Sequence, residues 1–225
     1  HRSKFSASYA SFNTQNYRVL ADCPTAENSS YYFGLNRAES DGFADNLNPQ
    51  GNDATSESWN SRLGFDFTTE DGLEIGFGGT WEEFNMGAQP LVPRTTSGNN
   101  KRVGFYDRNS SENETAQINS NSQFLKLSIP TDYGNITSVT SRFDWEIDPS
   151  LVDLTFGDAQ LANADIRAFG FISSTSNIIE SQERIAEELI FSSDEASEWV
   201  WHWGLYFAND EIEGSADRTF PTRGG

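Results

Sequence analysis

The feature of this sequence that most constrains its fold is a two-residue alternation of apolar and polar side chains, interrupted by short polar turns. In residues 59–67 and 73–81 the large apolar side chains fall on odd positions and the charges and glycines on even positions. A four-residue polar turn, 69–72, separates the two segments. Successive side chains of a β-strand point to opposite faces, so each segment is predicted to be a strand with one aromatic-rich face. That division suits a sheet with lipid on one side and water on the other.

The same alternation recurs along the chain and gives about nine strand candidates. They are residues 5–9, 17–21, 31–35, 59–67, 73–81, 124–129, 136–145, 185–191 and 199–207. Polar segments at about 40–56, 85–122 and 146–182 are predicted to be long loops, the last with short strands of its own around 152–156 and 166–169. Short turns alternating with long loops are typical of outer-membrane barrels, whereas soluble sandwiches rarely need structureless loops of this length.

Composition narrows the classes of function. The 225 residues carry a formal net charge of −19, which argues against nucleic-acid binding because phosphates require a basic surface. No run of about 18 apolar residues exists, so no transmembrane helix is predicted; barrel strands need only about 9–11 residues each. The single cysteine, Cys23, excludes a disulfide framework and a cysteine-rich zinc site.

The acidic residues suggest two kinds of chemistry, glycoside hydrolysis and calcium binding, and the sequence evidence for each is weak. Two carboxylates on one face could hydrolyse a glycoside, and Asp144 and Glu146 share a face, but such pairs are expected by chance among 34 acids. The acidic segment 41–53 could hold calcium, although its spacing does not match an EF-hand loop, and a solvated loop is favoured. His202 has only His1 as a second histidine. The sequence therefore predicts no catalytic site, no metal site and no cofactor.

Several segments together resemble the TonB-dependent receptors of Gram-negative outer membranes. The stretches that carry the resemblance are SASYASFNTQNYRVLADCP, SDGFADN, SRLGFDFTTEDGLEIGFGGTWEEF, ERIAEELIFSSD and SEWVWHWGLYFANDEIE. The resemblance implies an all-β fold: residues 1–225 would be about nine strands of a 22-stranded antiparallel transmembrane barrel, with short periplasmic turns and long outer loops. It also implies that the plug domain and the TonB box lie outside these residues.

The function implied by the resemblance is TonB-coupled uptake of a scarce, bulky nutrient such as a ferric siderophore, a cobalamin or an oligosaccharide. The partners would be the rest of the barrel, the plug, the TonB complex, the ligand and outer-membrane lipid. The residues expected to face the lumen, and so to contact ligand or plug, are Arg62, Asp66, Glu74, Glu82, Lys126, Arg142, Asp144, Glu188 and His202. The alternative is a soluble secreted β-rich binding or adhesion module resembling a lectin.

Two further expectations follow from a membrane location. The six tryptophans near strand ends would form interfacial girdles, since indole is apolar with one polar N–H; they are Trp59, Trp81, Trp145, Trp199, Trp201 and Trp203. Glu187 shares its parity with Ile185, Leu189 and Phe191, so its carboxylate would face lipid. That placement costs free energy, less than for Arg or Lys at the same depth.

Overall fold

The computed structural model describes residues 2–46, 51–88, 107–108, 113–153, 175–194 and 198–219, and its regular elements are all β-strands. The strands are β1 (Arg2–Ala10), β2 (Thr14–Ala26), β3 (Ser29–Ser40), β4 (Asp45–Asn46), β5 (Ser56–Thr68), β6 (Glu74–Met86), β7 (Asp107–Arg108), β8 (Thr115–Thr131), β9 (Gly134–Asp153), β10 (Thr175–Ser193) and β11 (His202–Thr219). No helix in these ranges is long and apolar enough to cross a membrane.

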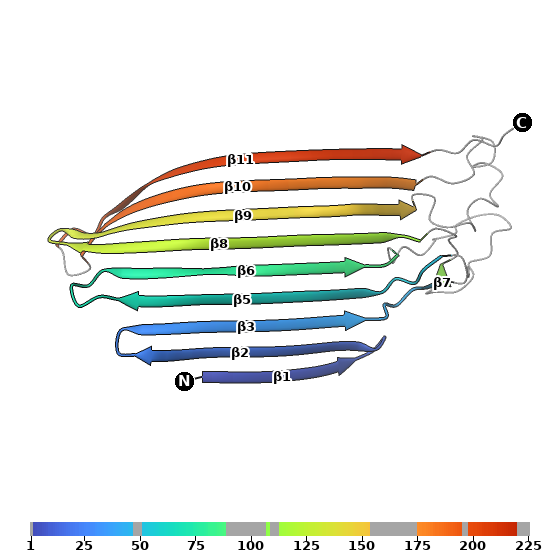
Figure 1. Ribbon diagram of the computed structural model, residues 1–225, viewed down its shortest axis with the longest axis horizontal. Coiled ribbons are helices and arrows are strands. Elements are labelled where there is room, and N and C mark those ends of the chain that lie inside the picture. The colour runs from blue at the N-terminus through green and yellow to red at the C-terminus, as the bar shows by residue number, and fades with distance from the viewer. Residues whose placement is uncertain are drawn as a thin grey trace, which may run out of the picture.

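Nine of the strands form one antiparallel sheet in the order β1-β2-β3-β5-β6-β8-β9-β10-β11, so each strand pairs with its neighbours in the chain (Figure 1). The prediction of nine antiparallel strands is confirmed. Within the described residues the sheet is open, with β1 and β11 as its two edges. The two-residue strands β4 and β7 form a separate parallel pair between two of the long connections.

The connections differ at the two ends of the sheet. At one end, called here the short-turn end, β5 and β6 are joined by residues 69–73 and β8 and β9 by residues 132–133 (Figure 1, left). At the other, the long-loop end, residues 87–114 connect β6 to β8 (Figure 1, right). The turn between β1 and β2 is the short exception there, and it places Phe12 and Asn13 at positive φ.

Some predicted strand boundaries are wrong. β8 begins at Thr115 and β10 at Thr175, so both strands extend into segments predicted to be loops. The first half of β8 is rich in Asn, Gln and Ser, but its backbone pairs with β6 and β9 throughout, and pairing rather than hydrophobicity makes it a strand. β11 begins at His202, three residues later than predicted. β9 reaches Asp153; the remainder of the 152–156 candidate, and the 166–169 candidate, lie outside the described residues.

The register assigns every side chain to one of two faces. The aromatic face is the side that carries Trp59, Leu63 and Phe65 of β5, and the cavity face is the side that carries Arg62 and Asp66. Side chains that pair directly across strands share a face, so Leu63 lies opposite Phe33 of β3 on the aromatic face. In the adjacent row on the same face, Phe65 pairs with Phe77 of β6, which pairs with Leu125 of β8.

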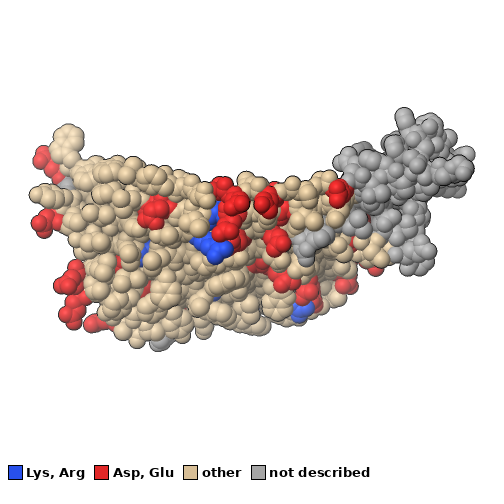
Figure 2. Space-filling model, turned by 45° about the horizontal axis from the view of Figure 1, so that its top comes forward, with Lys and Arg blue, Asp and Glu red and all other residues tan. Residues whose placement is uncertain are grey.

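The sheet buries almost none of its large apolar side chains. Among the described residues, the buried hydrophobic side chains are all alanines, whereas Phe77 is 51% exposed and Leu63 is 50% exposed. Figure 2 shows a largely uncharged area between acidic side chains at one end and a mixed group of acidic and basic side chains near the middle of the molecule. An apolar surface of this extent marks a face that contacts lipid or another protein surface.

Candidate functional site

A large hollow with a volume of about 1270 Å³ lies on the cavity face of the described sheet. Six neighbouring strands, β1, β2, β3, β5, β6 and β8, supply its walls. Its chemically distinctive lining residues are Arg2, Lys4, Asp22, Tyr32, Arg62, Asp66 and Phe124. The cavity therefore combines cations, carboxylates and aromatic rings.

Two glycines allow large side chains to lie flat on the floor of this cavity. A β-carbon at Gly64 would lie 2.1 Å from Cζ of Tyr32, so the tyrosine ring occupies the space above that glycine. A β-carbon at Gly34 would lie 2.9 Å from Nε of Arg62, so the arginine reaches from β5 back over β3. The guanidinium carbon of Arg62 is 6.0 Å from the centroid of the Tyr32 ring, which is a cation–π contact.

The cations of the sheet divide into two groups. Four form ion pairs with carboxylates: Arg37, Lys126, Arg142 and Arg184. The other four cations with described side chains lie on the cavity face, and none has an ion pair with a described residue: Arg2, Lys4, Arg18 and Arg62. Arg18 and Arg62 also line a second hollow of about 310 Å³ beside the first. The unpaired positive charge of the described sheet is thus concentrated in one place.

Two of the residues predicted to face the lumen line the cavity, and several others lie beside it. Arg62 and Asp66 are in its wall. Glu74 is on the same face and pairs with Lys126 at 3.3 Å. Glu82 accepts hydrogen bonds from Asn60 and from Ser120, the latter at 3.2 Å. These interactions link three strands, so Glu74 and Glu82 are engaged within the sheet rather than open to a ligand.

Two more of the predicted residues lie on β10 and β11. Glu188 lies on the cavity face in register with Val139, and His202 lies on the same face at the start of β11. Their strands do not contribute to the lining of the large cavity. No group of three or more His, Cys, Asp or Glu that could hold a metal occurs in the described ranges, and the Asp53 carboxylate accepts a hydrogen bond from the backbone of Asn46 at 2.7 Å.

The prediction that Arg142 and Asp144 share a face with Arg62 is wrong. Arg142 is in register with Gln123 of β8, which pairs with Gly79 and through it with Leu63, so Arg142 and Asp144 lie on the aromatic face. They form an ion pair at 3.0 Å. The prediction fails because β9 carries large apolar side chains on its other face, the cavity face, and local alternation does not say which face of a strand continues the aromatic face of its neighbours.

The tryptophans follow the same division. Trp59, Trp81 and Trp203 lie on the aromatic face, and Trp203 stacks on Phe191 with ring centroids 4.0 Å apart. Trp145 lies on the cavity face, in register with Ser120 and Gln182. Trp199 and Trp201 precede β11 in the connection from β10.

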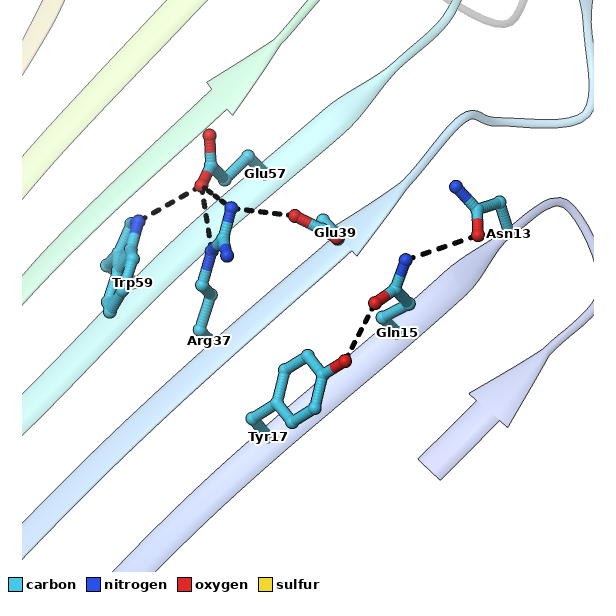
Figure 3. A network of polar contacts seen from close by, with 7 residues as sticks. All are labelled: Asn13, Gln15, Tyr17, Arg37, Glu39, Glu57 and Trp59. Carbon is cyan, nitrogen blue, oxygen red and sulfur yellow. Dashed lines mark hydrogen bonds and ion pairs between the residues drawn. The ribbon is translucent and has the colours of Figure 1, made fainter. Parts of the chain in front are cut away.

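A polar network marks the point where the aromatic face becomes charged. Arg37 of β3 lies between Glu39 and Glu57, with N–O distances of 2.7 Å and 2.8 Å (Figure 3). Its guanidinium carbon lies 5.1 Å from the Trp59 ring centroid, and the indole N–H donates to Glu57 at 3.2 Å. The hydrogen bond to Glu57 raises the pKa of Arg37, which keeps its charge at any physiological pH. Tyr17 of β2 is in register with Arg37, and its hydroxyl donates a hydrogen bond to Gln15 at 2.8 Å (Figure 3).

Glu187 lies on the aromatic face, as predicted, in register with Thr140 and Phe207. Its two carboxylate oxygens accept hydrogen bonds from the hydroxyl groups of Ser138, at 2.6 Å, and of Thr140. These two donors on the neighbouring strand satisfy part of the hydrogen-bonding capacity that a carboxylate on an apolar surface would otherwise lose.

The cavity and the hollow beside it contain residues that sequence reasoning missed: Arg2, Lys4, Tyr32 and Phe124 line the cavity, and Arg18 lines the hollow. Arg2 and Lys4 alternate with Ser3 and Phe5, and this parity could have placed them opposite the aromatic face. Their grouping with Arg62 required the register across four strands. No protein-family model matches the chain, and a search of curated proteins found no match.

Proposed function

We propose that this chain is part of a transmembrane β-barrel in the outer membrane of a Gram-negative bacterium, and that the complete protein is a TonB-dependent receptor. Its function would be uptake of a scarce, bulky nutrient, such as a ferric siderophore, a cobalamin or an oligosaccharide. The aromatic face would contact lipid and the cavity face would line the lumen. The observation that carries the membrane part of the proposal is the exposure of the large apolar side chains on the aromatic face, such as Leu63, Phe77 and Leu125.

The boundary of the apolar band is set by the last large apolar side chain on the aromatic face of each strand, counted toward the long-loop end. On the edge strands this residue is Tyr9 in β1, in register with Glu57 of β5, and Phe207 in β11, in register with Phe65. β9 and β10 do not follow one line between them: in β9 the residue is Ile136, in register with Phe191 and Trp203, and in β10 it is Ile179, in register with Ser215. From one sheet edge to the other, the boundary therefore moves by eight residue positions, about 26 Å, across eight strand spacings, about 38 Å. The line that joins these two edge residues is inclined by about 35°, a value within the range of strand tilts in membrane barrels.

The height of the band supports the same placement. In β5 the apolar side chains of the aromatic face extend from Phe67 to Trp59. Nine residues of strand cover about 26 Å, or about 21 Å along the normal at a tilt of 35°, close to the roughly 25 Å apolar belt of outer-membrane barrels. Glu57 and Arg37 then begin the charged surface, and Trp59 lies at the boundary with its N–H hydrogen-bonded, as interfacial tryptophans do.

The two edges of the sheet support the proposal that the chain pairs with further strands of a barrel. The described parts of β1 and β11 each pair with one neighbour only. Unpaired backbone N–H and C=O groups cost several kcal/mol each in lipid, so a membrane location requires further strands of the barrel to pair with both edges. A plug domain and the TonB complex are the other partners of the proposed receptor, and they would act through segments outside these residues.

Site-directed spin labelling of the whole protein in bilayers tests the membrane placement. With Cys23 replaced by Ser, single cysteines are introduced at Leu125 on the aromatic face, at Ser141 on the cavity face at nearly the same depth, and at Glu83 beyond the apolar band. The Leu125 label should be accessible to oxygen and protected from a water-soluble nickel chelate. The Ser141 and Glu83 labels should be accessible to the chelate. A Leu125 label protected from both reagents would indicate a packed, lectin-like sandwich and would refute the membrane placement.

Transport is tested separately in cells that produce the whole protein. Uptake of labelled ferric citrate, cyanocobalamin and maltooligosaccharides is measured with and without an uncoupler of the proton-motive force. Energy-dependent accumulation of at least one of these cargoes supports the receptor function. Uptake of all three that is insensitive to the uncoupler would contradict TonB coupling and favour a passive pore.

A further inference from the structure

We propose that the large cavity binds a ligand that carries at least two carboxylate or phosphate groups next to an apolar or aromatic portion. This inference deepens the proposed function, because such a ligand would be the cargo, or part of the cargo, of the receptor. It rests on the unpaired cations of the cavity face, on their arrangement and on the aromatic side chains between them.

The charge of the cavity has the opposite sign to that of the chain. The chain has a net charge of −19, yet the cavity and the hollow beside it contain four cations, Arg2, Lys4, Arg18 and Arg62, against two carboxylates, Asp22 and Asp66. Even if each carboxylate neutralised one cation by a side-chain rotation, two positive charges would remain. A local concentration of unneutralised cations in an acidic protein attracts anions and disfavours neutral ligands.

The register places these cations close together. Lys4 pairs with Leu20, Leu20 with Gly34 and Gly34 with Arg62, so Lys4 and Arg62 occupy one row across the sheet. The Arg62 side chain crosses back over Gly34, which shortens the distance between the two charges. Arg18 lies one row toward the long-loop end on the same face, and Arg2 lies one row toward the short-turn end. Three successive rows therefore present four cations, an arrangement that suits several anionic groups on one molecule.

The aromatic side chains define the second part of the ligand. Tyr32 lies flat over Gly64, and a β-carbon at Gly78 would lie 2.9 Å from its hydroxyl oxygen, so its ring covers two strands of the cavity floor. Phe124 lines the same cavity from β8. A ring or aliphatic group of the ligand would pack on these surfaces while its anionic groups contact the cations. The cavity volume of about 1270 Å³ exceeds the roughly 300–1,000 Å³ usual for small-molecule sites, so a bulky ligand would fit.

Isothermal titration calorimetry on the whole protein in detergent tests the proposal. The probes are citrate and pyrophosphate, with maltotriose as a neutral control, at 50 mM and 500 mM NaCl. At least one anionic probe should bind saturably at low salt, with weaker affinity at high salt because exposed charge interactions are screened, and maltotriose should not bind. Arg62→Gln and Lys4→Gln should each weaken binding by about tenfold, since each removes a charge-assisted contact. Arg62→Lys should retain most of the affinity.

Lys126→Gln is the matched control, because Lys126 is a cation of the same face whose charge is already neutralised by Glu74. It should change the affinity less than twofold. Equal losses in Lys126→Gln and Arg62→Gln would overturn the proposal, because they would indicate a diffuse field rather than a site. Absence of saturable binding to the correctly folded protein would overturn it as well.

Two outcomes separate this inference from the proposed function. If Leu125 labels report lipid but no anionic probe binds, the cavity proposal fails and the membrane proposal remains. If no probe binds and Arg62→Gln with Lys4→Gln makes the whole protein sensitive to trypsin, the four cations hold an acidic polypeptide segment instead, and the small-molecule ligand is refuted.

Discussion

Replacing Gly64 by Ala should displace the Tyr32 ring from the floor of the cavity. The added β-carbon would lie 2.1 Å from Cζ of Tyr32 and 2.3 Å from its Cε1 and hydroxyl oxygen, distances that real β-carbons do not show. The nearest atoms belong to a side chain rather than to the backbone, so the tyrosine should rotate away while the sheet remains intact. The contact between Tyr32 and Arg62 would then be lost.

The expected cost is the sum of opposing effects. Overpacking of this kind costs about 1–3 kcal/mol, and loss of a solvent-accessible cation–π contact costs about 0.5–1 kcal/mol. Alanine is better than glycine within a strand by roughly 0.5–1 kcal/mol, which offsets part of the loss. Gly64→Ala should therefore lower the free energy of unfolding by about 0.5–3.5 kcal/mol, with a central value of about 2 kcal/mol.

Urea unfolding of the whole protein in detergent, followed by tryptophan fluorescence, measures this effect. Gly214→Ala is the matched control, since its added β-carbon would lie 3.7 Å from the nearest side-chain atom, at Glu180, in ordinary contact; it should leave stability unchanged or raise it slightly. In a Tyr32→Ala background the cost of Gly64→Ala should disappear. The same cost in both backgrounds would refute the explanation, because it would show that the ring is not the obstacle.

Three other substitutions test the electrostatics of the sheet. Glu187→Leu should raise the urea midpoint of the protein in bilayers, because it removes a carboxylate from the aromatic face. A lower midpoint in bilayers would contradict lipid contact at that position. The pKa of Asp210 is lowered mainly by a hydrogen bond from Arg184 and to a smaller extent by one from Gln182. Ionised Asp210 therefore stabilises the folded state above the ordinary Asp pKa, and this stabilisation is lost as the pH falls through the lowered folded-state pKa. Asp210→Asn should therefore reduce the difference between urea midpoints at pH 6 and pH 3, and an unchanged difference would contradict this assignment. Arg37→Met should lower stability at low salt and much less at 1 M NaCl, since it leaves two neighbouring carboxylates unneutralised; equal effects at both salt concentrations would argue for lost packing instead.

The strands themselves were largely predictable. Period-two alternation identified all nine strands of the main sheet. The turn predicted at residues 69–72 is also present, and its Gly72 adopts a positive φ of 85°, a conformation that favours glycine. The boundaries that failed, at Thr115 and Thr175, belong to strand halves without an apolar face. Their side chains carry no alternating signal, and only the backbone pairing extends the sheet through them.

The candidate site was less predictable than the strands. Alternation correctly placed Arg62 and Asp66 opposite the aromatic side chains, because β5 has one strongly apolar face. In β9 the large apolar side chains Phe143 and Trp145 lie on the cavity face, and so Arg142 was assigned to the wrong side. Hydrophobicity within one strand gives two faces, but it does not relate them to the faces of the next strand.

The sequence by itself thus determined the all-β class, the antiparallel order, the acidic charge and the presence of an aromatic face, since all of these depend on local periodicity and composition. Tertiary structure decided the rest through the register. Hydrogen-bond pairing across the strands brought Lys4 and Arg62 into one row and placed the Tyr32 ring over Gly64. Register is a relation between segments far apart in the chain, so no single segment contains it.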